Sequence, residues 1–480
     1  MAYTVSQNTS LYTTASILQK AVSFIYFTIV ARLIGVENTG HYFFALSFAA
    51  IFTVIADFGL AAVLTRETAR YPDQTEGYLT TVLWTKIAFG LGSWVLMIGA
   101  AYALGYDPIL KKLILVAGLT MVFDNLHNVF FGVFRAHRNL LIESIGIIMS
   151  QTITMAVGLF ALWNHWPLWS LIAAYTIASA TTVIFAAIAA QRVYKLHYRL
   201  AFDTAILKSF INIAIPFGVA GILLRLYSYA DSIIMSKLLD PVYLGWWSVS
   251  YKITFAFQFL PVALSASIYP VMSSWMITNR EKIGELFVKA WRYLFLIVFP
   301  LTFGLGAIAE PLIVKLYGAA YLPSVTVLRI LLFSLVFGFL SFVTGATLNA
   351  TNNQKKQTTL LAVTLVTNVL LNLLLIPLFT IRGAAFAALI GNIILAVGGF
   401  VLVKKTVAIK TSELWDYGFN AFWPAAVMGI AALVLLKIMN LWLVIAISVL
   451  LYVVLLYVSG GLTKELVQEF KLKLLPQRSL

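Results

Sequence analysis

The chain has 480 residues, of which 61% are hydrophobic and 11% are charged, and it carries a formal net charge of +15. A water-soluble domain has about 45–50% apolar and about 25% charged residues, so this composition excludes an ordinary soluble protein and indicates an integral membrane protein. The chain has no cysteine, which excludes disulfides, thiol catalysis and cysteine-ligated metal sites.

Fourteen apolar runs, each long enough to cross a bilayer as a helix, recur along the chain and predict an all-α integral membrane protein. These runs lack the alternation over about ten residues that marks a membrane strand barrel. The predicted spans are residues 10–35, 40–64, 78–104, 110–134, 141–163, 168–190, 209–238, 244–272, 287–316, 323–350, 358–380, 383–403, 419–438 and 441–459.

The positive charge is concentrated in the connections that follow the even-numbered spans and in the C-terminal tail. Examples are Arg66, Arg135, Arg192, Lys355 and Lys404. Basic connections face the cytoplasm, so the pattern predicts a protein of the cytoplasmic membrane with both termini inside. Topology thus explains the net charge without a nucleic-acid partner.

The two halves of the chain share a motif when they are aligned with a shift of 205 positions. Arg32-Leu33-Ile34 and Gly40-His41-Tyr42 fall on Lys237-Leu238-Leu239 and Gly245-Trp246-Trp247. We therefore predict two pseudo-symmetric six-helix lobes of parallel orientation, which suit alternating access. The expected parts are an N-terminal lobe at 1–195, a C-terminal lobe at 196–405, two further spans at 406–459 and a cytoplasmic tail at 460–480.

The C-terminal tail carries apolar residues at every fourth position. They are Leu462, Leu466, Phe470 and Leu474. With charged residues such as Lys464 between them, they predict an amphipathic helix on the inner leaflet, and a frayed tail is the alternative.

Central basic side chains are the first candidates for a binding site, because an ion inside a bilayer costs several kcal/mol unless it faces water, a partner or a ligand. Lys20 and Arg225 lie in the middle of the first and seventh predicted spans, and Lys252 lies in the eighth. If they face the interface between the lobes, they form a cationic cavity suited to a phosphate or diphosphate. The alternative is that each pairs with a carboxylate or reaches the membrane edge, and we favour it for Lys86 and Arg329.

Four acidic residues of the predicted spans are candidates to carry a coupling proton or sodium ion. They are Asp57, Asp124, Asp231 and Glu310. Asp124 has His127 and Asn128 at i+3 and i+4, on the same helix face, and a structural hydrogen-bonded cluster is the alternative for this group. For Asp57 we expect an interfacial ion pair with Arg66 rather than a role in transport.

Three tyrosines flank the central cations in the sequence, and they are Tyr227, Tyr229 and Tyr251. Aromatic rings can stack on sugar faces, so we take these residues as candidates for binding a glycan, with interfacial anchoring as the alternative. The five histidines are scattered, and neither a Gly-rich phosphate loop nor a Ser, His and Asp arrangement is visible. The sequence therefore predicts no catalytic, metal or cofactor site.

Several motifs resemble the polysaccharide flippases of the multidrug/oligosaccharidyl-lipid/polysaccharide exporter superfamily, which include bacterial O-antigen repeat-unit flippases. The matching stretches are Ala31 to Gly35 with Gly40-His41-Tyr42, Asp57-Phe58-Gly59-Leu60, Phe134-Arg135-Ala136, Asn372 to Pro377, and Gly383-Ala384-Ala385. The resemblance extends over most of the chain. It is specific to the superfamily rather than to a substrate.

This resemblance implies two six-helix lobes in a V shape, alternating access and a polyprenyl-diphosphate-linked oligosaccharide as cargo, for O-antigen, capsule or exopolysaccharide assembly. Cationic residues on the first, seventh and eighth helices line the cavity in that family. Lys20, Arg225 and Lys252 match them by helix position. The last two spans resemble those of lipid II flippases, which form a groove for lipid, so membrane lipids are expected partners.

Two other functions remain open. One is an ion-coupled extruder of small drugs or metabolites, for which a site for organic cations would favour acidic over basic cavity residues. The other is a membrane polysaccharide polymerase or glycosyltransferase, which would be expected to carry a long outer loop or an Asp-x-Asp metal site. The sequence shows neither of these features, so we predict a transporter and not an enzyme.

Overall fold

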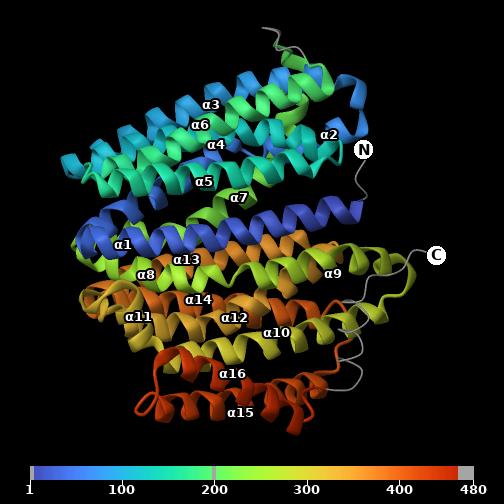
Figure 1. The fold of residues 1–480 in the computed structure, drawn as a ribbon. Coiled ribbons are helices and arrows are strands. Elements are labelled where there is room, and N and C mark those ends of the chain that lie inside the picture. The colour runs from blue at the N-terminus through green and yellow to red at the C-terminus, as the bar shows by residue number, and fades with distance from the viewer. Residues whose placement is uncertain (1–4, 197–201, 463–480) are drawn as a thin grey trace. The chain divides into compact units, whose positions relative to one another are not determined.

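The structure is a computed structural model that describes residues 5–196 and 202–462 (Figure 1). Those residues form α-helices and two short 3-10 helices, and no strand. The chain divides into two compact units, Met1–Ser248 and Val249–Leu480. The predicted part boundaries at 195, 405 and 459 stay predictions. Most of the predicted tail helix falls on residues 463–480, outside the described residues.

The first unit opens with α1 (Val5–Asp57), which holds the first predicted span and most of the second and is broken at Gly35. Gly35 adopts φ 80° and ψ 172°, a combination open almost only to glycine. Polar side chains satisfy the carbonyls that the break frees: Asn38 Nδ2 donates to Ile34 O at 2.9 Å, and Thr39 Oγ1 donates to Gly35 O at 2.7 Å. The predicted connection at residues 36–39 therefore follows directly on the break.

A second break separates α1 from α2 (Leu60–Arg70) at Phe58 and Gly59, whose φ angles are 43° and 78°. Positive φ is strained for a bulky residue such as Phe58. The break packs tightly on α7 (Thr204–Leu238). The closeness is shown by Gly59, where an added Cβ atom would lie only 3.2 Å from Ala214 O. The second predicted span, 40–64, is thus two helical pieces.

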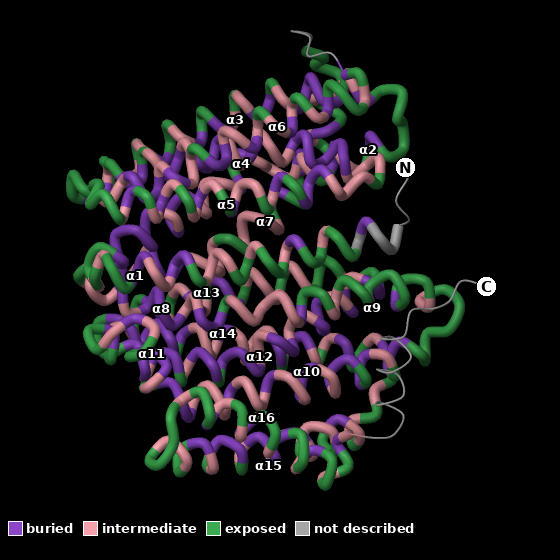
Figure 2. The backbone as a smooth tube through the Cα atoms, in the orientation of Figure 1, coloured by how far each residue is buried: buried purple, intermediate pink, exposed green. Residues whose placement is uncertain are grey.

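The remaining elements of the first unit are η1 (Pro72–Gln74), α3 (Thr75–Ala103), α4 (Pro108–Ala136), α5 (Leu140–Trp163), α6 (Trp169–Tyr194) and the start of α8 (Pro241–Ala256). Buried residues follow the length of α4, which packs against α3 and α6 (Figure 2). In lipid, close packing rather than escape from water holds helices together, and small residues permit it. Gly146 beside Phe131 and Gly158 beside Tyr26 are examples.

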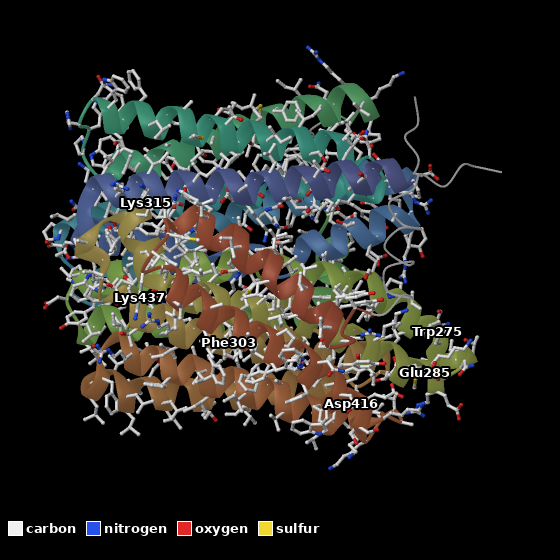
Figure 3. The ribbon with its side chains drawn as sticks, turned by 60° about the horizontal axis from the view of Figure 1, so that its bottom comes forward. Trp275, Glu285, Phe303, Lys315, Asp416 and Lys437 are labelled. Atoms are coloured by element: carbon white, nitrogen blue, oxygen red, sulfur yellow. The ribbon has the colours of Figure 1, made fainter. Side chains whose placement is uncertain are left out.

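The second unit contains the rest of α8 and nine further elements. They are α9 (Phe259–Thr278), α10 (Glu281–Ala307), α11 (Ala309–Tyr317), η2 (Ala319–Tyr321), α12 (Ser324–Ala350), α13 (Gln354–Phe379), α14 (Ile381–Lys404), α15 (Thr411–Leu435) and α16 (Leu441–Val458). Its core is formed by α10, α12 and α14, with Phe287, Phe339 and Ala396 among the buried residues. Phe303 of α10 lies edge-on to Phe422 of α15, with ring centroids 5.2 Å apart, and joins α15 to this core (Figure 3).

The two ends of the second unit carry charged residues. Lys315 and Lys437 lie at one end, and Trp275, Glu285 and Asp416 lie at the other (Figure 3). Lys315 and Lys437 are among the last residues of the ninth and thirteenth predicted spans, whereas Trp275, Glu285 and Asp416 follow the eighth and twelfth. The arrangement within this unit therefore agrees with helices that cross the membrane in alternating directions.

Twelve segments of the described chain are long and apolar enough to cross a membrane. Ser10–Asp57 counts as one of them although it holds two predicted spans, and α4, which carries Asp124 and Arg135, is not among the twelve. The prediction of an all-helical, multi-pass membrane protein is confirmed. The count of fourteen spans stays a prediction.

Candidate functional site

The predicted cationic residues of the first unit lie on α1 and α7, and the contact of Gly221 with Val54 is made by the second segment of α1. Lys20 is in the first segment of α1 and Arg225 is in the middle of α7, and both side chains are exposed. Arg225 forms no ion pair or hydrogen bond with any residue that the structure describes, and Asp231 and Asp124 are therefore not its partners. An exposed guanidinium in the middle of an apolar helix can bind an anion.

The predicted tyrosines fall on α7 and α8. Tyr227 and Tyr229 are half-buried on α7, and Tyr229 shares the helix face of Arg225, four residues earlier. Tyr251 and Lys252 lie on the part of α8 that belongs to the second unit and are half-buried. The Tyr251 ring stacks on Phe255 with centroids 5.6 Å apart. Because the six candidate binding residues are divided between the units, their convergence on one cavity stays a prediction.

Asp124 is the centre of a polar cluster within the first unit. Ser179 Oγ of α6 donates to Asp124 Oδ1 at 2.5 Å, and His127 Nδ1 lies 3.8 Å from the same oxygen. Asn128 Nδ2 donates to the backbone oxygen of Asp124 at 2.8 Å. The Asp124 side chain keeps 45% of its surface exposed. A role in ion coupling stays a prediction.

Asp57 does not pair with Arg66, so this expectation was wrong. Its Oδ1 atom is bonded to Lys86 Nζ of α3, and its Oδ2 atom accepts from Gly59 N at 3.2 Å. Arg66 lies beyond the break and contacts Glu67, with Nε and Oε1 3.4 Å apart. Lys86 has no exposed side-chain surface, so it needs a carboxylate within reach. The interpretation of Lys86 as a paired cation is confirmed.

Asp231 and Glu310 have opposite environments. Asp231 is 8% exposed in α7, and its Oδ1 accepts from Ser232 N at 2.6 Å and Ser232 Oγ at 3.2 Å. Glu310 is exposed in the first turn of α11, where a negative charge suits the helix dipole. A role for Glu310 in ion coupling stays a prediction.

One buried pair was not found from the sequence. Arg135, part of a motif cited above, binds Glu143 of α5 through two bonds, Nε to Oε2 at 2.9 Å and Nη2 to Oε1 at 2.5 Å. The Glu143 side chain is 2% exposed. The indication in the sequence was the short connection at residues 137–139, which brings the ends of α4 and α5 together. In the described chain no group of three or more His, Asp or Glu residues could hold a metal ion.

Comparisons with known proteins agree with this architecture. A family model described as polysaccharide biosynthesis protein matches residues 5–276, and one described as MatE matches residues 216–374. The chain is similar to the probable flippase AglR of Haloferax volcanii, with 25% identity over 396 residues that cover 78% of each chain. It is also similar to the probable low-salt glycan biosynthesis flippase Agl15 of the same organism, with 25% identity over 162 residues, but that match spans only 34% of either chain.

Two solved structures share the fold. The lipid II flippase MurJ in an inward closed conformation gives a TM-score of 0.76 at 16% identity, covering 96% of this chain and 99% of that one. An inward-facing multidrug resistance transporter of the MATE family gives 0.69 at 15% identity, covering 81% and 94%. At these identities the likeness shows the fold alone.

Proposed function

This chain belongs to the polysaccharide biosynthesis protein family, and on that premise we propose that it is a flippase for a polyprenyl-diphosphate-linked oligosaccharide. The predicted membership of the multidrug/oligosaccharidyl-lipid/polysaccharide exporter superfamily is confirmed. In the proposed function the cargo is loaded at the cytoplasmic face of the cytoplasmic membrane and released outside by alternating access. It then serves the assembly of O-antigen, capsule or exopolysaccharide.

The observation that carries this proposal is the environment of Arg225. An arginine in the middle of a membrane helix is costly, yet this one is exposed and has no carboxylate partner among the described residues. A diphosphate offers oxygens that a guanidinium binds through two parallel hydrogen bonds. Lys20, in the first segment of α1, and Lys252 would add point charges to the same anion.

The remaining candidates have roles that follow from their chemistry. Tyr227, Tyr229 and Tyr251 would stack on the sugars beside the diphosphate, while the lipid tail stays in the bilayer. The Asp124 carboxylate, half-exposed and bonded to Ser179, would take up a coupling H⁺ or Na⁺. Similarity to a probable flippase and to a probable low-salt glycan biosynthesis flippase supports transport over a membrane polymerase or glycosyltransferase.

A small-molecule extruder is the second candidate function, because the MatE match over residues 216–374 includes Arg225 and Lys252. The two functions differ in the charge that the cargo must have. Basic residues at both positions favour an anionic cargo over the organic cations that acidic cavity residues would suit.

The proposal is tested with Arg225→Ala and Arg225→Lys in cells whose surface polysaccharide depends on this protein. We expect Arg225→Ala to abolish export. Arg225→Lys should keep part of it, because lysine keeps the positive charge but cannot form the two parallel hydrogen bonds of a guanidinium. Arg192→Ala, at an exposed arginine near the end of α6, is the matched control. Normal export by both Arg225→Ala and Lys20→Ala, at verified membrane levels, would show that the cationic-site mechanism is wrong.

A further inference from the structure

Gly40 and Gly245 occupy equivalent positions of the sequence repeat, and the structure brings them into contact. A Cβ atom on Gly40 would lie 1.9 Å from Pro241 O and 3.0 Å from Gly245 N. A Cβ atom on Gly245 would lie 2.1 Å from Val36 O. Real Cβ atoms essentially never come closer than 3.0 Å to such atoms, so the two helices meet backbone to backbone. No residue other than glycine fits at either position.

The crossing is sealed from solvent. Thr39 is 0% exposed, His41 is 7% exposed and Trp247 is 1% exposed. Thr39 and His41 flank Gly40 in the chain, and Trp247 lies two residues after Gly245. The second segment of α1 and the first turns of α8 therefore close tightly on each other within the first unit.

A second set of contacts holds the C-terminal end of α7, which lies just before Pro241 at the start of α8. Lys237 Nζ is bonded to Leu104 O and lies 3.5 Å from the centroid of the Tyr106 ring. The Tyr106 hydroxyl is 2.9 Å from Ser236 Oγ. The connection between α3 and α4 thus holds the end of α7 from which α8 starts.

We propose that the crossing of Gly40 and Gly245 is the closed gate at this end of the transport path, with Tyr106, Ser236 and Lys237 as its latch. The inference rests on the proposed flippase function. Gly40 belongs to the predicted N-terminal lobe and Gly245 to the predicted C-terminal lobe, so their contact joins the lobes where the chain passes through the break at Gly35. Alternating access requires such a contact to form and to separate in each cycle. Two glycines allow this because they have no side chains to disengage.

The gate is tested by the reactivity of a cysteine at a sealed position. The chain has no cysteine of its own, so Thr39→Cys introduces a single thiol next to the crossing. The purified full chain in nanodiscs is treated with a maleimide, and the labelling rate reports the fraction of time that the crossing is open. Gly40→Ala and Gly245→Ala are then added separately to this background. Gly92→Ala is the matched control, since a Cβ atom on Gly92 meets nothing within 4 Å.

We expect labelling to be about tenfold faster in the two gate variants, because an added methyl group that cannot fit favours separation of the helices. Gly92→Ala should label at the parent rate. Tyr106→Phe removes the hydroxyl from the latch without adding volume, and it should raise labelling by about threefold. If Gly40→Ala, Gly245→Ala and Tyr106→Phe all label at the parent rate, the proposal that this crossing is a gate is wrong.

The labelling experiment needs no cargo, which separates this inference from the proposed function. If surface polysaccharide does not depend on the parent protein while the labelling rates change as expected, the flippase assignment fails and the gate stands. If export depends on Arg225 but labelling is the same in all variants, the flippase assignment stands and the gate fails.

Discussion

Lys86 and Asp57 form an ion pair in which the lysine side chain is 0% exposed and the aspartate side chain is 32% exposed. The pair joins the middle of α3 to the end of α1. The same carboxylate accepts a hydrogen bond from Gly59 N, at the break before α2. One acidic side chain therefore neutralises a buried cation and fixes a strained turn.

The first prediction concerns this pair. Asp57→Asn leaves the Lys86 ammonium without its counter-charge, and breaking a buried pair in this way costs about 3–5 kcal/mol. We expect a large fall in the thermal unfolding temperature of the purified protein. The double variant Asp57→Asn/Lys86→Met should recover most of the loss, because it removes both charges.

The control for that experiment is the exposed pair of Lys410 and Glu413, whose charged atoms are 3.3 Å apart. Glu413→Gln should change stability by no more than about 1 kcal/mol. A fall as large as that of Asp57→Asn would show that loss of any carboxylate destabilises the protein. The particular role of the buried pair would then be refuted.

The second prediction concerns the packing of α1 on α5. A Cβ atom on Gly158 would lie 2.0 Å from the hydroxyl oxygen of Tyr26, which is itself fully buried. Gly158→Ala should therefore destabilise the protein by about 1–3 kcal/mol through overpacking. Gly158→Ala/Tyr26→Phe should recover part of the stability, because the clashing oxygen is gone. Gly99→Ala, where a Cβ atom meets nothing within 4 Å, should be neutral or stabilising. Equal effects at the two glycines would contradict this packing.

The third prediction concerns ion coupling at Asp124. Asp124→Asn cannot gain or lose a proton, so transport in this variant should no longer respond to an imposed H⁺ or Na⁺ gradient. Ser179→Ala removes one hydrogen bond to the carboxylate and should weaken the response without abolishing it. Transport is measured with each gradient imposed in turn, with Asp73→Asn, at an exposed residue of η1, as the control. An unchanged response in Asp124→Asn would assign the cluster a purely structural role.

The fold could be predicted from the sequence where the determining forces are local. Apolar runs of span length marked the membrane helices, and the gap between the first two runs, at residues 36–39, fell next to the break at Gly35. The break at Phe58 and Gly59 was not expected, because it depends on packing against Ala214 of α7, far along the chain. No proline and no run of polar residues in the sequence indicates this break.

The polar contacts, too, could be predicted only where the two residues are close in sequence. The i+3 spacing placed His127 beside Asp124, which the structure confirms at 3.8 Å. Ser179 lies on another helix, and helical periodicity gives no information about such a neighbour. The predicted partner of Asp57 was wrong for the same reason. Arg66 is near Asp57 in sequence, but it is the buried Lys86, on another helix, that contacts Asp57.

The fourth prediction concerns topology. The break at Gly35 should face the outside, so a cysteine introduced by Asn38→Cys should react with an impermeant maleimide added to intact cells. Asn38 is exposed, and the chain has no competing thiol. Asn353→Cys, between α12 and α13, should react only in inverted vesicles. Modification of the Asn38 position only from the cytoplasmic side would reverse the predicted orientation, and with it the face at which cargo is loaded.

The central claim is that the protein moves a lipid-linked oligosaccharide and that Arg225 binds its diphosphate. The most direct measurement reconstitutes the purified chain in liposomes with a fluorescent polyprenyl-diphosphate-linked oligosaccharide and follows its transfer between leaflets. We predict rapid transfer by the parent protein and a rate lower by about tenfold or more for Arg225→Ala, as expected when charge-assisted hydrogen bonds are lost. Transfer by the parent that equals that of protein-free liposomes, or undiminished transfer by Arg225→Ala, would contradict the claim.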